Sequence, residues 1–202
     1  MKLKTKDLLT LDELSEKEVI QIIELGIKLK KQKKANAKPL LKNKTLAMIF
    51  EKPSTRTRVS FETGMHQLGG HALNLSSNKL QLSRGETIED NAKTLSRYVD
   101  AIMARVYDHK TLDILSKNCK IPVINGLSNS FHPCQTLADL MTLKEKKKKF
   151  KGLKIAWIGD GNNVCNSLLY GCSKLGINVS VATPKGFEPD RTVVQKCKKG
   201  SS

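Results

Sequence analysis

Short apolar runs alternate with segments of helical periodicity along almost the whole chain, and this alternation restricts the possible folds more than any other property of the sequence. Strands alternating with helices are typical of a parallel α/β sheet with helices on both faces. The expected strands are residues 44–50, 71–76, 100–106, 121–127, 153–161 and 177–184, and the expected helices are 11–34, the segment after Pro53, 85–99, 111–119, the segment from Ser130 and 162–176.

The distribution of the strands predicts two domains. Four expected strands precede the lysine run of residues 144–154, and two follow it. We therefore expect a complete domain over residues 1–150 and the start of a second over residues 151–202. The second is expected to be incomplete, because two strands do not make a stable doubly wound sheet alone. The terminal KCKKGSS carries no recognisable structural pattern.

The charge balance favours anionic partners. The 202 residues include 36 Lys and Arg against 19 Asp and Glu, a formal net charge of +17. Nucleic acid, a phosphorylated metabolite or an acidic surface would each suit that charge. Aromatic residues are only 4% of the chain, and no nucleic-acid-binding motif is present. We therefore expect no nucleic-acid partner.

The chain shows no targeting or membrane signal. No apolar stretch approaches the roughly 18 residues that span a bilayer. The N-terminus lacks the apolar core of a secretory signal and the acid-poor pattern of a transit peptide. The five cysteines form no CxxC pair, which argues against a disulfide framework and a zinc site. We expect reduced thiols, no metal, no membrane association and a cytoplasmic protein.

The strongest chemical signal is FEKPSTRTR, residues 50–58, at the expected junction of a buried strand and a helix. Ligands of open α/β sheets bind at the carboxyl ends of strands, and a helix N-terminus presents unpaired N–H groups to an anion. Arg56 offers a bidentate phosphate contact. The hydroxyls that add donors here belong to Ser54, Thr55 and Thr57.

Two further strand ends carry polar groups. Arg105 closes the apolar run DAIMARV, where it needs an anion or an acidic partner. His132 and Gln135 belong to HPCQ, in which Pro133 suits a first helical turn. A His polarises a carbonyl oxygen, and a Gln accepts from an amide. Alone, Arg105 is equally compatible with a structural salt bridge, and a lone His is more often structural.

Together these donors suit electrostatic catalysis of group transfer from an acyl phosphate. They include neither an obvious nucleophile nor a metal cage. The turn GDGNN, residues 159–163, is similar to a dinucleotide fingerprint, but Val164 stands where the third glycine belongs. We therefore expect no nicotinamide cofactor there, and the Asn side chains remain available at a strand end.

FEKPSTRTRVSFE, the Arg105 strand, GLSNSFHPCQTLAD and WIGDGNN, taken in this order, closely resemble the ornithine carbamoyltransferase family. STRTR and HPxQ are shared with aspartate carbamoyltransferases, whereas Lys52 and the GDGNN turn resemble the ornithine enzymes. The resemblance runs to about Pro189. It implies a carbamoyl phosphate domain followed by an ornithine domain, and a homotrimer without a cofactor.

The resemblance implies transfer of the carbamoyl group of carbamoyl phosphate to the δ-amine of L-ornithine, giving citrulline and phosphate. Arg56, Arg105 and His132 would be catalytic, and Asn163 would contact ornithine. Arg105 would bridge phosphate and carbonyl oxygen, His132 would help to polarise the carbonyl, and Gln135 would bind the carbamoyl amide. The residues implied to reach the phosphate are Ser54, Thr55, Arg56, Thr57 and Gln81.

The family's HCLP segment and SMG loop do not occur in this sequence, so we expect a C-terminally truncated member. The carbamoyl phosphate half of the site is represented, while most of the ornithine half is not. Two alternatives therefore stay open. One is a carbamoyltransferase for another amine, such as aspartate, putrescine or a modified ornithine. The other is a non-catalytic binding or regulatory remnant.

Overall fold

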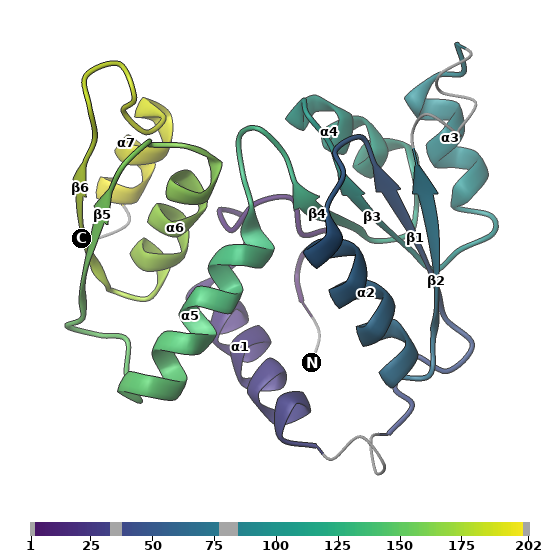
Figure 1. Cartoon of the computed structure of the whole chain (residues 1–202), viewed down its shortest axis with the longest axis horizontal. Helices are drawn as coiled ribbons and strands as arrows, with labels where there is room; N and C mark the ends of the chain where they lie inside the picture. The colour runs from purple at the N-terminus through teal and green to yellow at the C-terminus, as the bar shows by residue number, and fades with distance from the viewer. Residues whose placement is uncertain (1–2, 33–37, 77–84, 200–202) are drawn as a thin grey trace. The chain divides into compact units, whose positions relative to one another are not determined.

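A computed structural model describes residues 3–32, 38–76 and 85–199. The chain divides into two compact units, which Figure 1 shows in one cartoon. The four-stranded unit comprises Lys6–Leu9 and Gln32–Ser128. The two-stranded unit comprises Met1–Thr5, Thr10–Lys31 and Asn129–Ser202. Each unit is named after its sheet and is described by itself.

All strands of the four-stranded sheet are parallel, in the order β2-β1-β3-β4. Apolar side chains fill β1 and β3, whereas β2 is an exposed edge strand. The register of the two central strands pairs Phe50 with Arg105, so both strands end at the same level. The strands are β1 (Thr45–Phe50), β2 (His71–Ser76), β3 (Ala101–Arg105) and β4 (Val123–Leu127).

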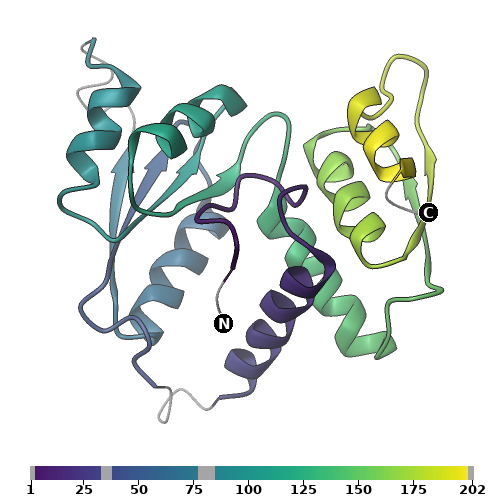
Figure 2. The same cartoon turned by 180° about the vertical axis from the view of Figure 1, so that it is seen from behind.

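Helices cover both faces of this sheet, as the alternation predicts. One face packs against α2 (Thr55–Gln67) through Met65 and Phe61. The opposite face packs against α3 (Ile88–Leu95) and α4 (His109–Asn118) in a second apolar cluster. The two faces can be compared in Figures 1 and 2. The α/β fold class is therefore confirmed.

Local sequence signals explain where several helices begin and end. Thr87 is the N-cap of α3, and its hydroxyl accepts a hydrogen bond from the Asp90 N–H. Pro133 stands in the first turn of α5 (Pro133–Lys147). Gly176, the last residue of the expected helix 162–176, has a φ of 63°, in the left-handed region that glycine tolerates best.

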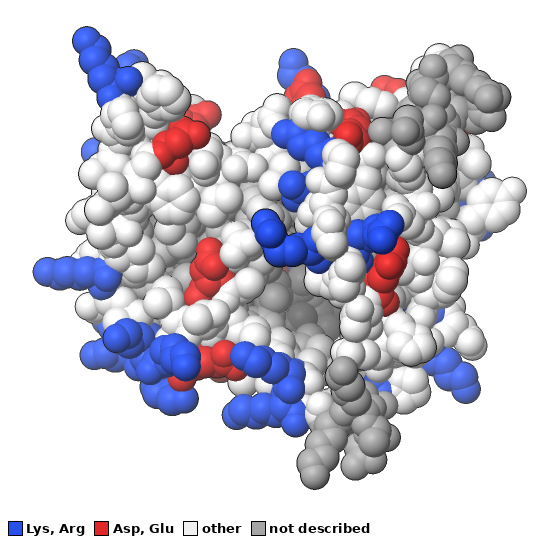
Figure 3. Space-filling model, in the orientation of Figure 1, with Lys and Arg blue, Asp and Glu red and all other residues white. Residues whose placement is uncertain are grey.

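The two-stranded unit combines a small parallel sheet with helices. Its strands are β5 (Lys154–Ile158) and β6 (Asn178–Ala182). Between them runs α6 (Asn163–Lys174), the most buried helix of this unit. Helix α1 (Glu16–Lys31) lies beside α5, and the Lys30 ammonium is 2.8 Å from the Glu145 carboxylate. Figure 3 shows lysines gathered over the C-terminal ends of α1 and α5.

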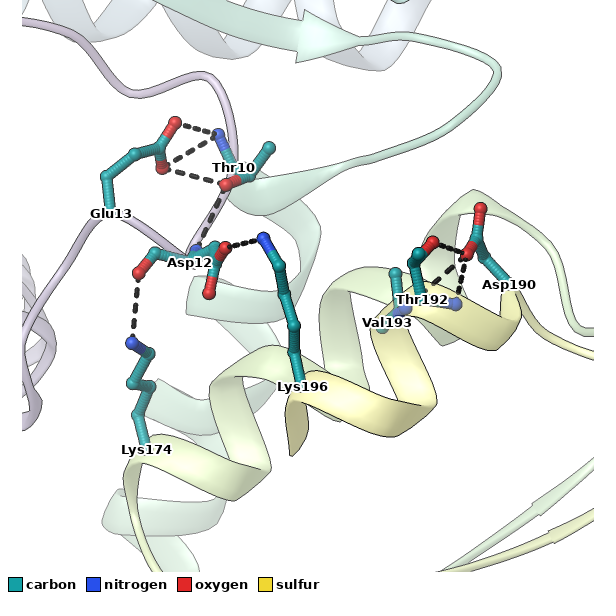
Figure 4. Close-up of polar contacts among 8 residues, drawn as sticks. All are labelled: Thr10, Asp12, Glu13, Lys174, Asp190, Thr192, Val193 and Lys196. Carbon is teal, nitrogen blue, oxygen red and sulfur yellow. Dashed lines mark hydrogen bonds and ion pairs between the residues drawn. The ribbon is translucent and has the colours of Figure 1, made fainter. Parts of the chain in front are cut away.

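The last helix, α7 (Arg191–Lys199), was not expected from the sequence. Its N-terminus is capped by Asp190, whose Oδ1 accepts from the Thr192 N–H at 2.7 Å. Further along α7, the Lys196 ammonium is 2.7 Å from Asp12 Oδ2, and Lys174 donates to the Asp12 carbonyl oxygen at 2.9 Å (Figure 4). These contacts fix α7 beside α6. No helix in the described part of the chain is long and apolar enough to cross a bilayer.

Candidate anion site at the carboxyl edge of the sheet

The STRTR motif, residues 54–58, forms the N-cap and the first turn of α2, which follows β1. Strand β1 ends at Phe50, and Ser54 is the N-cap of α2 with extended backbone angles, φ −159° and ψ 107°. The Ser54 Oγ accepts from the Thr57 N–H at 3.3 Å and donates to Thr57 Oγ1 at 3.0 Å. Thr55 and Arg56 are exposed in the first turn. The helix N-terminus therefore lies directly after the carboxyl end of a central strand.

Arg105 ends the neighbouring strand β3 at the same level. Its Nε is buried and has no hydrogen-bond partner among the described residues. Burial lowers the pKa of the Arg105 guanidinium, and the positive charge of Arg56 lowers it further. Two guanidiniums therefore approach one another, and a buried N–H donor stays unsatisfied.

An anion would suit both features of this edge. A phosphate would accept from Arg105 Nε, neutralise the repulsion between the two guanidiniums and face the positive end of α2. The five residues predicted for this part of the site thus belong to one unit and one sheet edge. They are Ser54, Thr55, Arg56, Thr57 and Arg105.

His132 and Gln135 belong to the two-stranded unit, at the start of α5. His132 is the N-cap residue, and its backbone N–H donates to the buried Ser167 Oγ at 2.7 Å. Gln135 is exposed and its Nε2 donates to Asp139 Oδ1 at 2.9 Å. Burial raises the pKa of Asp139, while that hydrogen bond lowers it. The hydrogen bond between His132 and Ser167 joins the start of α5 to α6.

Asn163 is the last residue of GDGNN and the first residue of α6. Asn162 caps this helix, with its Oδ1 accepting from the Val164 and Cys165 N–H groups at 3.0 and 3.3 Å. Gly161 packs against backbone, because a Cβ added there would lie 2.2 Å from the Pro189 nitrogen. The glycine in this turn therefore permits close packing of the chain.

The described residues supply neither an activated cysteine nor a metal cage. Burial raises the pKa of the Cys134 and Cys165 thiols to about 11, which keeps both protonated at neutral pH. In the ranges that the structure covers, no three His, Cys, Asp or Glu side chains are grouped as metal ligands. Gln81 lies outside the described residues.

The sequence analysis missed two contacts at the carboxyl edge. Glu51 Oε2 accepts from the Tyr107 backbone N–H at 2.8 Å, which joins the segments that follow β1 and β3. His109 Nδ1 lies 2.9 Å from the Oγ of Ser128, a fully buried residue after β4. The sequence signal for the first contact is Pro53, which cannot continue a sheet ladder.

Family models match both parts of the chain. Residues 6–145 match the model described as aspartate/ornithine carbamoyltransferase, carbamoyl-P binding domain. Residues 151–202 match aspartate/ornithine carbamoyltransferase, Asp/Orn binding domain. The chain belongs to the aspartate/ornithine carbamoyltransferase family. The sequence-based recognition is therefore confirmed.

Individual members of this carbamoyltransferase family are similar over nearly the whole chain. The ornithine carbamoyltransferase of Cenarchaeum symbiosum is 60% identical over 198 residues, covering 98% of this chain and 65% of the relative. That of Bacillus thuringiensis subsp. konkukian is 55% identical over 195 residues, covering 96% of this chain and 61% of the relative.

Solved carbamoyltransferase structures share the fold. The Pyrococcus furiosus ornithine carbamoyltransferase superposes with a TM-score of 0.95 at 54% identity, covering 100% of this chain and 65% of that one. The Thermus thermophilus enzyme gives a TM-score of 0.91 at 44% identity, with coverages of 96% and 67%. The chain thus spans 61% to 65% of the length of the two curated relatives.

Proposed function

We propose that this chain carries the carbamoyl phosphate site of an ornithine carbamoyltransferase. In the whole enzyme that site would serve carbamoyl transfer to the δ-amine of L-ornithine, giving citrulline and phosphate, a reaction of arginine biosynthesis or catabolism. The main support is the unsatisfied Arg105 Nε beside Arg56 at the N-terminus of α2. The names of relatives up to 60% identical support the choice of ornithine.

In this proposal the donors at the carboxyl edge contact different parts of carbamoyl phosphate. The hydroxyls and N–H groups of Ser54, Thr55 and Thr57 hold the phosphate oxygens at the start of α2. Arg56 binds the phosphate as a fork, and Arg105 bridges phosphate and carbonyl oxygen. These groups do not move protons, so their contribution is positioning and charge stabilisation.

The reaction proceeds by attack of the deprotonated amine on the carbonyl carbon. The lone pair of the amine forms the new C–N bond, and the carbonyl oxygen gains the negative charge that Arg105 and His132 are proposed to stabilise. Collapse breaks the C–O bond to the phosphate, which leaves with the electron pair. The amine then releases a proton. The rate should rise with pH through the pKa of the attacking amine, since only the neutral form attacks.

Three residues of the two-stranded unit complete the proposed assignment. His132 polarises the carbonyl oxygen, and Gln135 accepts from the carbamoyl amide with Oε1 while Nε2 donates to Asp139. Asn163 contacts ornithine. We assign residues 1–150 to the carbamoyl phosphate domain and 151–202 to the start of the ornithine domain. The family models over residues 6–145 and 151–202 support this division.

The remaining assignments rest on the family resemblance. Gln81 is proposed to reach the phosphate, and the whole enzyme is proposed to be a cytoplasmic homotrimer that needs no cofactor. Sedimentation equilibrium of the purified chain tests the oligomeric state. A monomer at concentrations well above those of the assay would contradict the trimer for this chain.

The decisive experiment is a calorimetric titration of the chain with carbamoyl phosphate, with Arg56→Ala alongside. We expect saturable binding by the parent chain. The variant should lose about 2–3 kcal/mol of binding free energy, the scale of hydrogen bonds to a charged group. No binding by a folded parent chain, or equal binding by the variant, would refute the site.

The five donors at the carboxyl edge all belong to the four-stranded unit, and this favours one second candidate. In that alternative the chain binds carbamoyl phosphate without turnover, as a regulatory remnant. A citrulline assay on the titrated sample separates the two. Citrulline formation that requires Arg105 supports the enzyme, whereas saturable binding without citrulline supports the non-catalytic protein.

A further inference from the structure

We propose that Glu51 is a positioning residue for the anion site, acting through the backbone of the segment after Arg105. The inference rests on the proposed function, because it concerns the same phosphate site. It starts from a carboxylate that joins two strand ends. The Glu51 N–H donates to the Arg105 carbonyl oxygen at 2.9 Å, and Glu51 Oε2 accepts from the Tyr107 N–H at 2.8 Å.

The first of these bonds is the last bond of the β1–β3 ladder. Phe50 and Arg105 are register partners, and in a parallel ladder successive bonds alternate in direction between the two strands. The next bond would run from the Tyr107 N–H to the Glu51 carbonyl oxygen. The side-chain oxygen of Glu51 accepts that N–H instead. A carboxylate thus takes the place of a backbone acceptor where β1 leaves the sheet.

Pro53 explains why a substitute is needed. The bond after that one would require an N–H at residue 53, and proline has none. Proline also disfavours the helical conformation for Lys52 before it. The chain therefore turns away from β3 toward Ser54 and the start of α2. Without Glu51, the Tyr107 N–H would lose its acceptor at this turn.

A second contact links the same two segments. The Lys52 ammonium lies 4.3 Å from the centre of the Tyr107 ring. On the other side, the Val106 N–H donates to the Leu127 carbonyl oxygen at 2.9 Å, and Val106 is fully buried. The two residues after Arg105 are thus fixed to both neighbouring strands. The Glu51 carboxylate supplies the hydrogen bond on the β1 side.

This arrangement determines how Arg105 meets Arg56. Their guanidiniums repel each other, and the distance between the two backbone segments limits how far apart the side chains can move. Glu51 keeps that distance short by holding the end of β3 against the turn that leads to Arg56. The ligand then meets a preformed pair of cations, and preorganisation of this kind improves affinity.

The test compares variants of Glu51 in the full chain, titrated with carbamoyl phosphate. Glu51→Gln keeps a neutral acceptor of the same length and should bind as the parent does. Glu51→Ala removes the acceptor and should weaken binding about tenfold, as expected for one hydrogen bond. Glu51→Asp, which is one methylene shorter, should also bind more weakly. Glu62→Ala is the matched control, because Glu62 pairs with Arg58 on the surface of α2.

The outcomes separate this inference from the proposed function. Positioning is supported if the parent chain binds, Glu51→Gln keeps its affinity and Glu51→Ala loses affinity while its urea midpoint stays unchanged. If Glu51→Ala binds as the parent does, the role of Glu51 is refuted while the proposed function stands. The same holds if Glu51→Gln binds as weakly as Glu51→Ala. If Glu51→Ala does not fold, the Asp and Gln variants decide in the same way. A folded parent chain without binding overturns the proposed function and this inference with it.

Discussion

Arg56 and Arg105 affect the ligand-free and the phosphate-bound protein in opposite ways. Their mutual repulsion lowers the pKa of Arg105, in addition to the effect of burial. The same two charges are what a bound phosphate requires. The anion site is therefore a place where binding and stability of the free chain conflict.

This conflict predicts a stabilising substitution. Arg56→Gln should raise the free energy of unfolding of the ligand-free chain by on the order of 0.5 kcal/mol, since Arg56 is exposed and solvent screens the repulsion. The gain should shrink in high salt. Urea unfolding of parent and variant at low and high salt measures it. A variant less stable than the parent at low salt would contradict the repulsion.

Replacing two glycines by alanine should change the free energy of unfolding in opposite directions. Gly161→Ala places a Cβ 2.2 Å from the Pro189 nitrogen, so the backbone must move. The substitution should lower the free energy of unfolding by about 1–3 kcal/mol. Gly64, inside α2, has nothing within 4 Å of an added Cβ. Gly64→Ala should therefore stabilise by about 0.5–1 kcal/mol, the helix-propensity difference. Urea midpoints measure both changes, and a neutral Gly161→Ala would refute the close packing.

At the scale of elements, the start of α1 depends on one carboxylate. Glu18 accepts from the Lys4 N–H at 2.6 Å and from the N–H and hydroxyl of Ser15 at 2.9 and 2.7 Å. These bonds, that of Lys4 first, lower the pKa of Glu18 from 4.5 to about 2. The ionised carboxylate therefore holds the N-terminal segment against the helix.

The lowered pKa predicts a pH dependence with a definite sign. The folded state holds the Glu18 proton less tightly than the unfolded state, so the stabilisation is complete above pH 4.5 and is lost as the pH falls toward 2. Parent and Glu18→Gln should differ in melting temperature at pH 6 and converge toward pH 2. Glu24→Gln, at an exposed position of the same helix, is the control. A parent–Glu18→Gln difference that stays constant across this range would contradict the account.

The elements differ in how much of them the sequence reveals. Strands β1 and β3 are continuous apolar runs, and Thr87 and Pro133 are local signals, so all four could be predicted. Helix α7 buries Val193 and depends on Lys196 meeting Asp12, 184 positions away. The role of Glu51 likewise requires the β1–β3 register. Contacts between distant residues carry no local periodicity, which is why these features were missed.

At the scale of the whole molecule, the net charge of +17 should attract the proposed phosphorylated ligand. Long-range attraction raises association rates and is screened by salt. We expect the association rate for carbamoyl phosphate, measured from phosphorus NMR line shapes, to fall as sodium chloride increases. Replacing Lys146, Lys147 and Lys149 by Glu should flatten that dependence, because the net charge drops by six. The matching Arg triple variant should retain it.

The strand order β2-β1-β3-β4 has a consequence for where a ligand can sit. From β1 the chain winds outward through α2 to β2, and then crosses back over β1 to begin β3. The connections therefore leave β1 and β3 toward opposite faces of the sheet, and ligands of open α/β sheets bind at such a point. The strand order determines this point independently of the side chains that line it. Substitutions at Arg56 or Arg105 should therefore change which anion binds, and how tightly, while the place of binding stays the same.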